Sequence, residues 1–248
     1  MTMAENDAEL ALRLATAAGA RLLELQQHSA LAGKALGDAG DAASNQCIID
    51  ALRLARPNDA ILCEEEKDDH TRLSAARVWI IDPLDGTREF SERRSDWAVH
   101  VALAINGTPA LGAVALPALN RTFSSAHPPS LLAPNNPPKM LVSRTRPAAQ
   151  AMAVAKALGA DVLPMGSAGA KAMAVVRGEA DIYLHTGGQY EWDNCAPAAV
   201  ALAAGLHVSR TDGTPLRYNN QDTYMPDLLI CRPEWAARVL TLMADLPR

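Results

Sequence analysis

The chain has 248 residues, of which 49% are hydrophobic and 21% are charged, and its formal net charge is −5. This composition predicts a globular protein with a large core, and it argues against the basic surface with which proteins bind nucleic-acid polymers. No apolar stretch approaches the roughly 18 residues of a membrane span, so no membrane association is expected. An acidic N-terminus and four scattered cysteines without a C-x-x-C pair favour a cytoplasmic protein with reduced thiols.

The first half of the chain begins with helical patterns and continues with strand patterns. Apolar residues recur at helical spacing over 5–28 and 44–55. Short apolar runs then predict strands at 61–64, 77–82, 97–105, 110–116 and 121–126. We therefore expect an N-terminal α+β half, residues 1–126, in which one sheet packs against two helices.

A Pro-rich segment at 127–138 separates this half from the rest. It holds five prolines, a composition typical of an extended connector rather than a helix or a central strand. In the remaining residues, 139–248, strand and helix patterns alternate, which predicts a second sheet with crossover helices. The predicted strands are 139–143, 161–164, 181–184 and 228–231, and the predicted helices are 148–158, 167–177, 194–204 and 233–246.

Two carboxylates end one of the predicted strands. The run W-I-I-D-P-L-D-G-T ends at Thr87, and its Pro and Gly interrupt regular structure. Such a turn presents the carboxylates of Asp82 and Asp85 to one point. The Leu84 carbonyl and the Thr87 hydroxyl join them, and together they form the oxygen-rich set that Mg²⁺ prefers. An isolated D-x-x-D is more often only a turn, so the metal interpretation depends on acids elsewhere in the chain.

Two further acidic segments supply such partners. Glu64 begins a run of three glutamates directly after a short apolar run. Asp193 lies in the segment E-W-D-N-C-A-P, just before an Ala-rich helical stretch. Alone, Asp193 is better explained as a helix N-cap. Glu66 fits a solvated acidic run better than a ligand, and Glu65 is only a weak candidate for a site role.

Taken together, the three acidic segments resemble the motifs of the inositol monophosphatase superfamily of Mg²⁺-dependent, lithium-sensitive phosphatases. That family has an acidic pair, then D-P-[IL]-D-G-T, then W-D-x-x-A-P/G, in the order found here. The match spans nearly the whole chain. It implies the family's layered α-β-α-β-α sandwich, with an active site in the cleft where both halves contribute residues, and a homodimer.

Within the superfamily, the chain is similar to the bisphosphate nucleotidase (CysQ-like) branch in its actinobacterial form. This resemblance rests on T-R-E-F after the Asp-Gly, V-S-R-T-R at 142–146, G-S-A-G-A-K at 166–171 and C-A-P at 195–197. It implies that the 3′-phosphate of adenosine 3′,5′-bisphosphate, a by-product of sulfate assimilation, is hydrolysed to give AMP. An inositol monophosphatase or a fructose-1,6-bisphosphatase is the alternative with the same chemistry. A non-catalytic nucleotide sensor is the alternative outside it.

The resemblance implies a set of metal ligands. Glu64, Asp82 and the Leu84 carbonyl are expected to hold one Mg²⁺, and Asp82, Asp85 and Asp193 a second, with two or three ions in all. Carboxylates this close repel one another unless cations lie between them. The ions are expected to neutralise the phosphoryl oxygens and to activate water.

Glu64, Thr87 and Asp41 form the expected catalytic set. Thr87 is expected to hydrogen-bond the attacking water while Asp41 orients the threonine hydroxyl, although Asp41 is explained equally well as a helix N-cap. The backbone amides of Gly86 and Thr87 suit phosphate oxygens. The family often has another acid where this chain has Cys47, so any contribution of that acid is absent.

A second substrate phosphate calls for additional cations. The candidates beside the motifs are Arg88, Arg144, Lys171 and Arg217, each of which is alternatively a plain surface residue. Lys171 is preferred because it shares a helix face with Ser167 near a helix N-terminus, where phosphate is favoured. The substrate is thus expected to contact these cations together with Glu64, Leu84, Asp85, Gly86, Thr87, Ser167 and Asp193.

Overall fold

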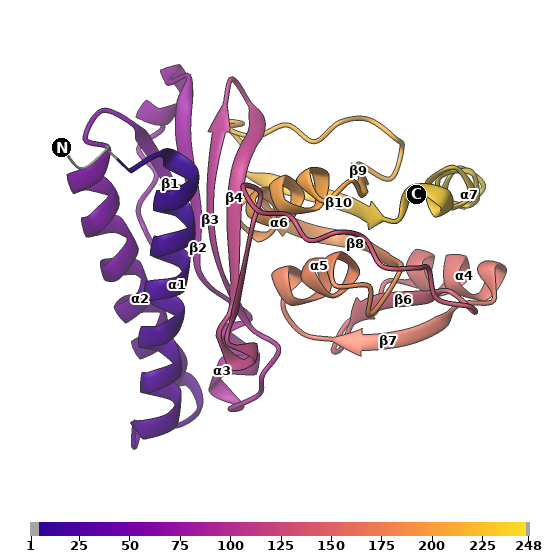
Figure 1. Cartoon of the computed structure of the whole chain (residues 1–248), viewed down its shortest axis with the longest axis horizontal. Helices are drawn as coiled ribbons and strands as arrows, with labels where there is room; N and C mark the ends of the chain where they lie inside the picture. The colour runs from indigo at the N-terminus through magenta and orange to yellow at the C-terminus, as the bar shows by residue number, and fades with distance from the viewer. Residues whose placement is uncertain (1–4, 247–248) are drawn as a thin grey trace.

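The computed structural model describes residues 5–246, in which three layers of helices alternate with two five-stranded sheets (Figure 1). Helices α1 (Asp7–His28) and α2 (Gly33–Ala55) cover the outer face of the first sheet. Helices α5 (Ala168–Val176) and α6 (Glu191–Ala203) lie between the two sheets, and α4 (Ala149–Leu158) and α7 (Pro233–Ala244) cover the far side. This is the α-β-α-β-α sandwich that the family resemblance implied, and that prediction is confirmed.

The first sheet has the strand order β1-β2-β3-β4-β5. Its strands are β1 (Ala60–Cys63), β2 (Arg77–Asp85), β3 (Ala98–Ile105), β4 (Thr108–Leu116) and β5 (Arg121–Ser124). Short helices follow three of them, η1 (Thr71–Ser74), α3 (Thr87–Ser91) and η2 (Pro117–Leu119). Strands β1 and β2 are parallel, with Cys63 opposite Ile81. The acids that follow these two residues therefore lie at the same end of the two strands, their C-terminal end.

Helix α1 shows why the outer layer forms. Asn6 caps it by accepting from the amide of Glu9, whose carboxylate accepts in turn from the Asn6 amide at 3.2 Å. Leu10, Leu14 and Leu22 then form a fully buried stripe at helical spacing, which packs against β3 and β4. Hydrophobic burial of this stripe fixes the helix on the sheet.

Helix α2 is longer than the sequence predicts. It begins at Gly33 rather than at residue 44, because its glycines weaken the helical pattern while serving a packing need. A Cβ at Gly40 would lie 2.9 Å from Leu84 Cδ2, so the helix approaches the acidic turn closely. Asp41 therefore lies inside the helix, and the alternative that it is an N-cap is wrong.

The second sheet has the strand order β7-β6-β8-β10-β9. Its strands are β6 (Lys139–Ser143), β7 (Asp161–Met165), β8 (Ile182–Tyr190), β9 (His207–Ser209) and β10 (Tyr224–Cys231). The three-residue β9 was missed because it is too short for a periodic signal. Strands β8 and β10 extend beyond the predicted bounds, and α6 begins at Glu191 instead of residue 194.

The central core joins the two sheets. It contains Val78 and Val114 from the first sheet, Leu141 and Ile230 from the second, and the helices between them. A division of the chain at 126 and 139 into two halves stays a prediction, because one apolar core spans both sheets. Among the described residues, no helix is long and apolar enough to cross a bilayer.

Candidate active site

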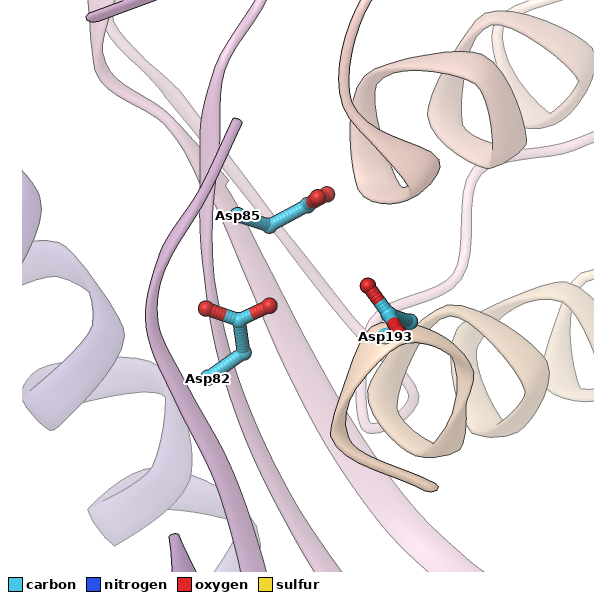
Figure 2. Close-up of side chains that lie close together, drawn as sticks. All are labelled: Asp82, Asp85 and Asp193. Atoms are coloured by element: carbon cyan, nitrogen blue, oxygen red, sulfur yellow. The ribbon is translucent and has the colours of Figure 1, made fainter. Parts of the chain in front are cut away.

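Three carboxylates from distant parts of the chain meet between β2 and α6. One oxygen each from Asp82, Asp85 and Asp193 lies within 4.8 Å of the other two. Figure 2 shows the side chains facing the space between the strand and the first turn of the helix. The structure thus brings together three of the predicted ligands, across a sequence separation that no local pattern constrains.

The surroundings of Asp82 make its charge costly. The side chain is 1% exposed, and one oxygen accepts from the Leu84 amide at 3.0 Å. Burial, together with the charges of Glu64 and Asp85, raises the pKa of Asp82 well above its ordinary value. A carboxylate in this position requires either a proton or a nearby cation.

The pKa values of Glu64 and Asp193 are raised as well. Glu64 is exposed as a whole residue, but its carboxyl group is hydrogen-bonded to Asp82, outside the three-oxygen cluster. Desolvation and the charge of Asp193 raise the pKa of Glu64 to about 7. Desolvation and the charge of Asp85 raise the pKa of Asp193 to about 6, while the Tyr190 amide donates to Asp193 at 2.6 Å.

The donor set fits a hard divalent cation. All the converging atoms are carboxylate oxygens, and burial together with mutual repulsion raises the pKa of Asp82 and of Asp193, an effect that a divalent charge would offset. Asp82, Asp85 and Asp193 are the residues placed to hold it, with Glu64 beside Asp82. A bound divalent cation would supply positive charge to phosphoryl oxygens and acidity to water.

Asp85 differs from its neighbours because donors surround it. The Ser167 hydroxyl and the amides of Ala168 and Gly169 donate to its two oxygens, the amides at 3.1 and 2.6 Å. His100 Nε2 lies 3.2 Å from Oδ2. Burial acts to raise the pKa of Asp85, but His100 and these donors outweigh it and hold the pKa at about 2. Asp85 is therefore charged whether or not a cation is bound.

Thr87 lies at the start of α3, directly after the acidic turn. Its hydroxyl is 3.2 Å from the Leu84 carbonyl oxygen and 3.4 Å from Asp41 Oδ1. Burial and the charge of Glu65 raise the pKa of Asp41 to about 7. The preceding Gly86 has φ +91°, a backbone conformation that other residues rarely adopt, and this turns the chain toward the pocket.

A cavity of about 280 Å³ opens beside Asp85 and Asp193. Its lining residues come from both sheets and from α3 and α5, and they are Asp85, Gly86, Thr87, Arg88, Glu89, Ser143, Arg144, Thr145, Arg146, Gly166, Ser167, Ala168, Lys171, Tyr183, His185, Gly188, Gln189 and Asp193. A larger cavity of about 480 Å³ lies beside α7, and none of the clustered carboxylates lines it. The smaller pocket is therefore the candidate active-site pocket, because two of the clustered carboxylates line it.

The predicted cations are placed unequally in this pocket. Arg144 donates to Glu89 and Glu92, each at 2.8 Å, so its charge is already neutralised. The buried Lys171 ammonium donates to the carbonyls of Gly166 and Ser167, and desolvation lowers the pKa of Lys171.

Two other arginines at the pocket are exposed. Among the residues that the structure describes, no ion-pair partner is found for the side chains of Arg88 and Arg146. Arg146 is not among the predicted cations, although it lies in the V-S-R-T-R segment on which part of the resemblance rests.

Some predicted residues lie elsewhere. The structure does not bring Arg217 to the pocket. It lines a separate cavity of about 340 Å³, and its guanidinium is 3.3 Å from the Thr108 hydroxyl. Glu66 accepts from Asn45 and Arg53, which agrees with a structural role.

His100 is the buried site residue that sequence reasoning missed. The only local signal was one ionisable residue inside the apolar run W-A-V-H-V-A-L-A-I. The ring contacts Asp85 on the neighbouring strand and the Trp192 carbonyl of α6. These contacts depend on tertiary packing, which the apolar run itself does not indicate.

Comparison with known proteins agrees with this geometry. The family model described as "Inositol monophosphatase family" matches residues 4–246. A 3'-phosphoadenosine 5'-phosphate phosphatase of Mycobacterium leprae is 49% identical over 255 residues, which cover 97% of this chain and 94% of that protein. The 3'(2'),5'-bisphosphate nucleotidase CysQ of Escherichia coli is 32% identical over 199 residues, which cover 75% of this chain and 81% of that protein.

A solved structure supports the same fold. The crystal structure of CysQ from Bacteroides thetaiotaomicron, a bacterial member of the inositol monophosphatase family, matches with a TM-score of 0.76 and 24% identity. The match covers 91% of this chain and 97% of that one. The predicted similarity to the bisphosphate nucleotidase branch is confirmed by the two relatives above. With its acidic motifs assembled into one cluster, the chain belongs to the inositol monophosphatase family.

Proposed function

We propose that this protein is a Mg²⁺-dependent phosphatase that removes the 3′-phosphate of adenosine 3′,5′-bisphosphate, the compound named 3'-phosphoadenosine 5'-phosphate in its Mycobacterium leprae relative. One observation carries the proposal: the carboxylate cluster opens directly into a pocket lined by Arg88, Arg144, Arg146 and Lys171. A substrate with two phosphates fits such a site, because one phosphate lies at the cluster and the other among the cations.

The carboxylates have a holding role in this proposal. Asp82, Asp85 and Asp193, with Glu64 and the Leu84 carbonyl, would hold two or three Mg²⁺ ions, which would supply positive charge to the scissile phosphate. Asp85 is ionised before any cation binds, because His100, the Ser167 hydroxyl and the Gly169 amide stabilise its charge. Glu64, Asp82 and Asp193, whose pKa values are raised, would give up their protons to hold a cation, so that cation binding would release protons near neutral pH.

Thr87 and Asp41 have a positioning role. With its pKa near 7, Asp41 is suited to accept the Thr87 hydroxyl proton in a hydrogen bond, which aims a threonine lone pair at the attacking water. The amides of Gly86 and Thr87 are proposed to bind phosphoryl oxygens, since the glycine leaves the backbone accessible there.

The uncleaved phosphate is assigned to the arginine side of the pocket. Within residues 5–246, Arg88 and Arg146 have no acidic partner to release, so they contribute their full charge. Arg144 must first exchange Glu89 and Glu92 for phosphate, which reduces its net contribution. The Lys171 ammonium donates to the Ser167 carbonyl, which holds that segment in place, and it adds positive charge to the pocket that it lines.

Steady-state kinetics on three substrates test the proposal. We expect kcat/KM to be highest for adenosine 3′,5′-bisphosphate, lower for inositol 1-phosphate and fructose 1,6-bisphosphate, and to vanish in EDTA. A clear preference for either sugar phosphate would reassign the enzyme within its family. Tight nucleotide binding without turnover in saturating Mg²⁺ would instead support a sensor.

The sequence and the family resemblance also imply a location, an oligomeric state, a metabolic role and an inhibitor for this protein. We propose a cytoplasmic homodimer that acts in sulfate assimilation and that Li⁺ inhibits in competition with Mg²⁺. Light scattering on the purified protein tests the dimer, because a monomeric mass at micromolar concentration contradicts it. Full activity in high Li⁺ at limiting Mg²⁺ contradicts the inhibition.

A further inference from the structure

His100 lies beside Asp85 of the carboxylate cluster although no motif contains it. It is the third residue of β3, directly opposite Asp82 in the strand register, and its side chain is completely buried. Its Nδ1 is 3.0 Å from the Trp192 carbonyl oxygen. Its Nε2 is 3.2 Å from Asp85 Oδ2. A single ring thus contacts the acidic turn on one side and the first turn of α6 on the other.

The two ring nitrogens have different surroundings. A carbonyl oxygen only accepts, so the contact with Trp192 places a hydrogen on Nδ1. Nε2 has no well-aligned hydrogen-bond acceptor among the described residues, despite its short distance to Asp85. Burying an imidazole in an apolar strand is costly, and apolar side chains would pack here without that cost. The contacts to Asp85 and α6 are what this ring provides and an apolar residue would not.

Three elements converge on the ring. The Trp192 carbonyl belongs to the residue before Asp193, so the hydrogen bond fixes the turn that presents this carboxylate. Helix α5 packs so closely that a Cβ at Gly169 would lie 2.1 Å from His100 Nε2. The same Gly169 donates its amide to Asp85. His100 therefore lies in contact with β2, α5 and α6 at once.

We propose that His100 is a positioning residue that holds Asp85 and the Asp193-bearing turn of α6 at the separation that a divalent cation requires. This inference rests on the proposed function as far as metal binding is concerned, but not on the identity of the substrate. Residues that orient metal ligands typically change metal affinity about 10- to 100-fold when they are replaced.

Three substitutions separate the two contacts. His100→Asn keeps an amide nitrogen near the position of Nδ1 and loses the contact with Asp85. His100→Gln reaches toward the position of Nε2 and loses the bond to Trp192. His100→Phe keeps the ring and loses both contacts. Val101→Ala is the matched control, because Val101 is buried on the same strand but belongs to the core beneath α1 and α2.

The measurement is Mn²⁺ binding to the full-length protein without substrate, followed by the loss of the free Mn²⁺ signal in electron paramagnetic resonance. We expect the Mn²⁺ dissociation constant to rise at least about tenfold in His100→Phe, and by a smaller factor in His100→Asn and His100→Gln. Val101→Ala is expected to lower Tm without changing this constant. In turnover assays, the metal concentration for half-activation should rise more than kcat falls.

The outcomes are distinguishable. Wild-type Mn²⁺ affinity in His100→Phe, or in both polar variants where His100→Phe does not fold, overturns the positioning role and leaves the proposed function intact. An equal loss of affinity in Val101→Ala reduces His100 to a general packing residue and also overturns the inference. A wild-type protein that binds no Mn²⁺ overturns the metal-dependent function together with it.

Discussion

The two walls of the active-site pocket are built in different ways. The wall from the first sheet carries Asp82 and Asp85, which are 1% and 6% exposed at the end of a central strand. The wall from the second sheet carries Arg144 and Arg146 on the loop after β6, and the first of these is paired with acids. The acidic wall is thus fixed by the core, while the basic wall is held by side chains that water reaches.

This difference separates two tasks of the site. Charges that must hold a metal ion are aimed by backbone and buried donors, so they need little reorganisation when the ion arrives. Arg144 and Arg146, two of the charges proposed to select a substrate, lie on a loop, where they can exchange partners and where sequence change is tolerated. We therefore expect substitutions in the acidic wall to act on every substrate, and substitutions in the basic wall to act on some.

Asp82→Asn should produce the largest effect. The substitution preserves shape and removes one negative charge from the centre of the cluster, so we expect kcat to fall at least about 100-fold for every substrate. The measurement is kcat in saturating Mg²⁺, with circular dichroism and Tm as the check on folding. A folded variant that keeps more than about a tenth of wild-type kcat would contradict the assignment of Asp82 to the metal ions.

Arg146→Ala should produce a large effect on bisphosphates only. Loss of a charge-assisted hydrogen bond of roughly 1.5–3 kcal/mol should lower kcat/KM for adenosine 3′,5′-bisphosphate about ten- to a hundredfold. Inositol 1-phosphate lacks the second phosphate and should be hydrolysed nearly as before.

Arg144→Ala is the matched control for Arg146→Ala. Glu89 and Glu92 already neutralise Arg144, so its loss should cost less. Equal losses on both substrates would place Arg146 at the scissile phosphate, and no loss on either would make it a plain surface residue.

The stability of the metal-free protein should depend on pH with an unusual sign. The pKa of Glu64 is raised to about 7 and that of Asp193 to about 6, so the folded state binds these protons more tightly than the unfolded state. Their contribution to the free energy of unfolding is present below the unfolded pKa values near 4 and is lost as pH rises toward 7.

Thermal denaturation in EDTA measures this contribution. We expect Tm to be a few degrees lower at pH 8 than at pH 5, where 1 kcal/mol corresponds to roughly 2–4 °C for a chain of this size. Excess Mg²⁺ should restore Tm at pH 8 and have little effect at pH 5. A Tm that Mg²⁺ leaves unchanged at pH 8 would contradict the origin of these raised pKa values.

Arg217→Ala should produce the smallest effect. This residue is exposed and lines a different cavity, so we expect kcat/KM for adenosine 3′,5′-bisphosphate to change less than about twofold. The same assay as for Arg146→Ala gives the comparison. A tenfold loss would show that the loop around Arg217 reaches the pocket during turnover.

In the sequence alone, periodicity predicted most strands and helices, and the family resemblance of three acidic segments implied the layered fold and the acidic ligands. The D-P-L-D-G-T segment follows a short apolar run, a pattern that favours a buried strand, and β2 continues through Pro83 to Asp85. Glu64 follows another such run, and parallel pairing of the two strands brings both ends to one edge. These features are local, and local patterns survive without knowledge of the partner elements.

Only the tertiary structure decided how the acids are held and which cations line the pocket beside them. Ser167 reaches Asp85 across 82 residues, His100 joins Asp85 to the turn before Asp193, and Glu89 occupies Arg144. Likewise, the sequence did not predict the first part of α2, because Gly40 weakens the helical pattern. The glycine is small enough for the helix to pack closely against Leu84. Such contacts depend on how helices and sheets are layered, and the periodicity of any one segment contains no information about the side chains that another segment places against it.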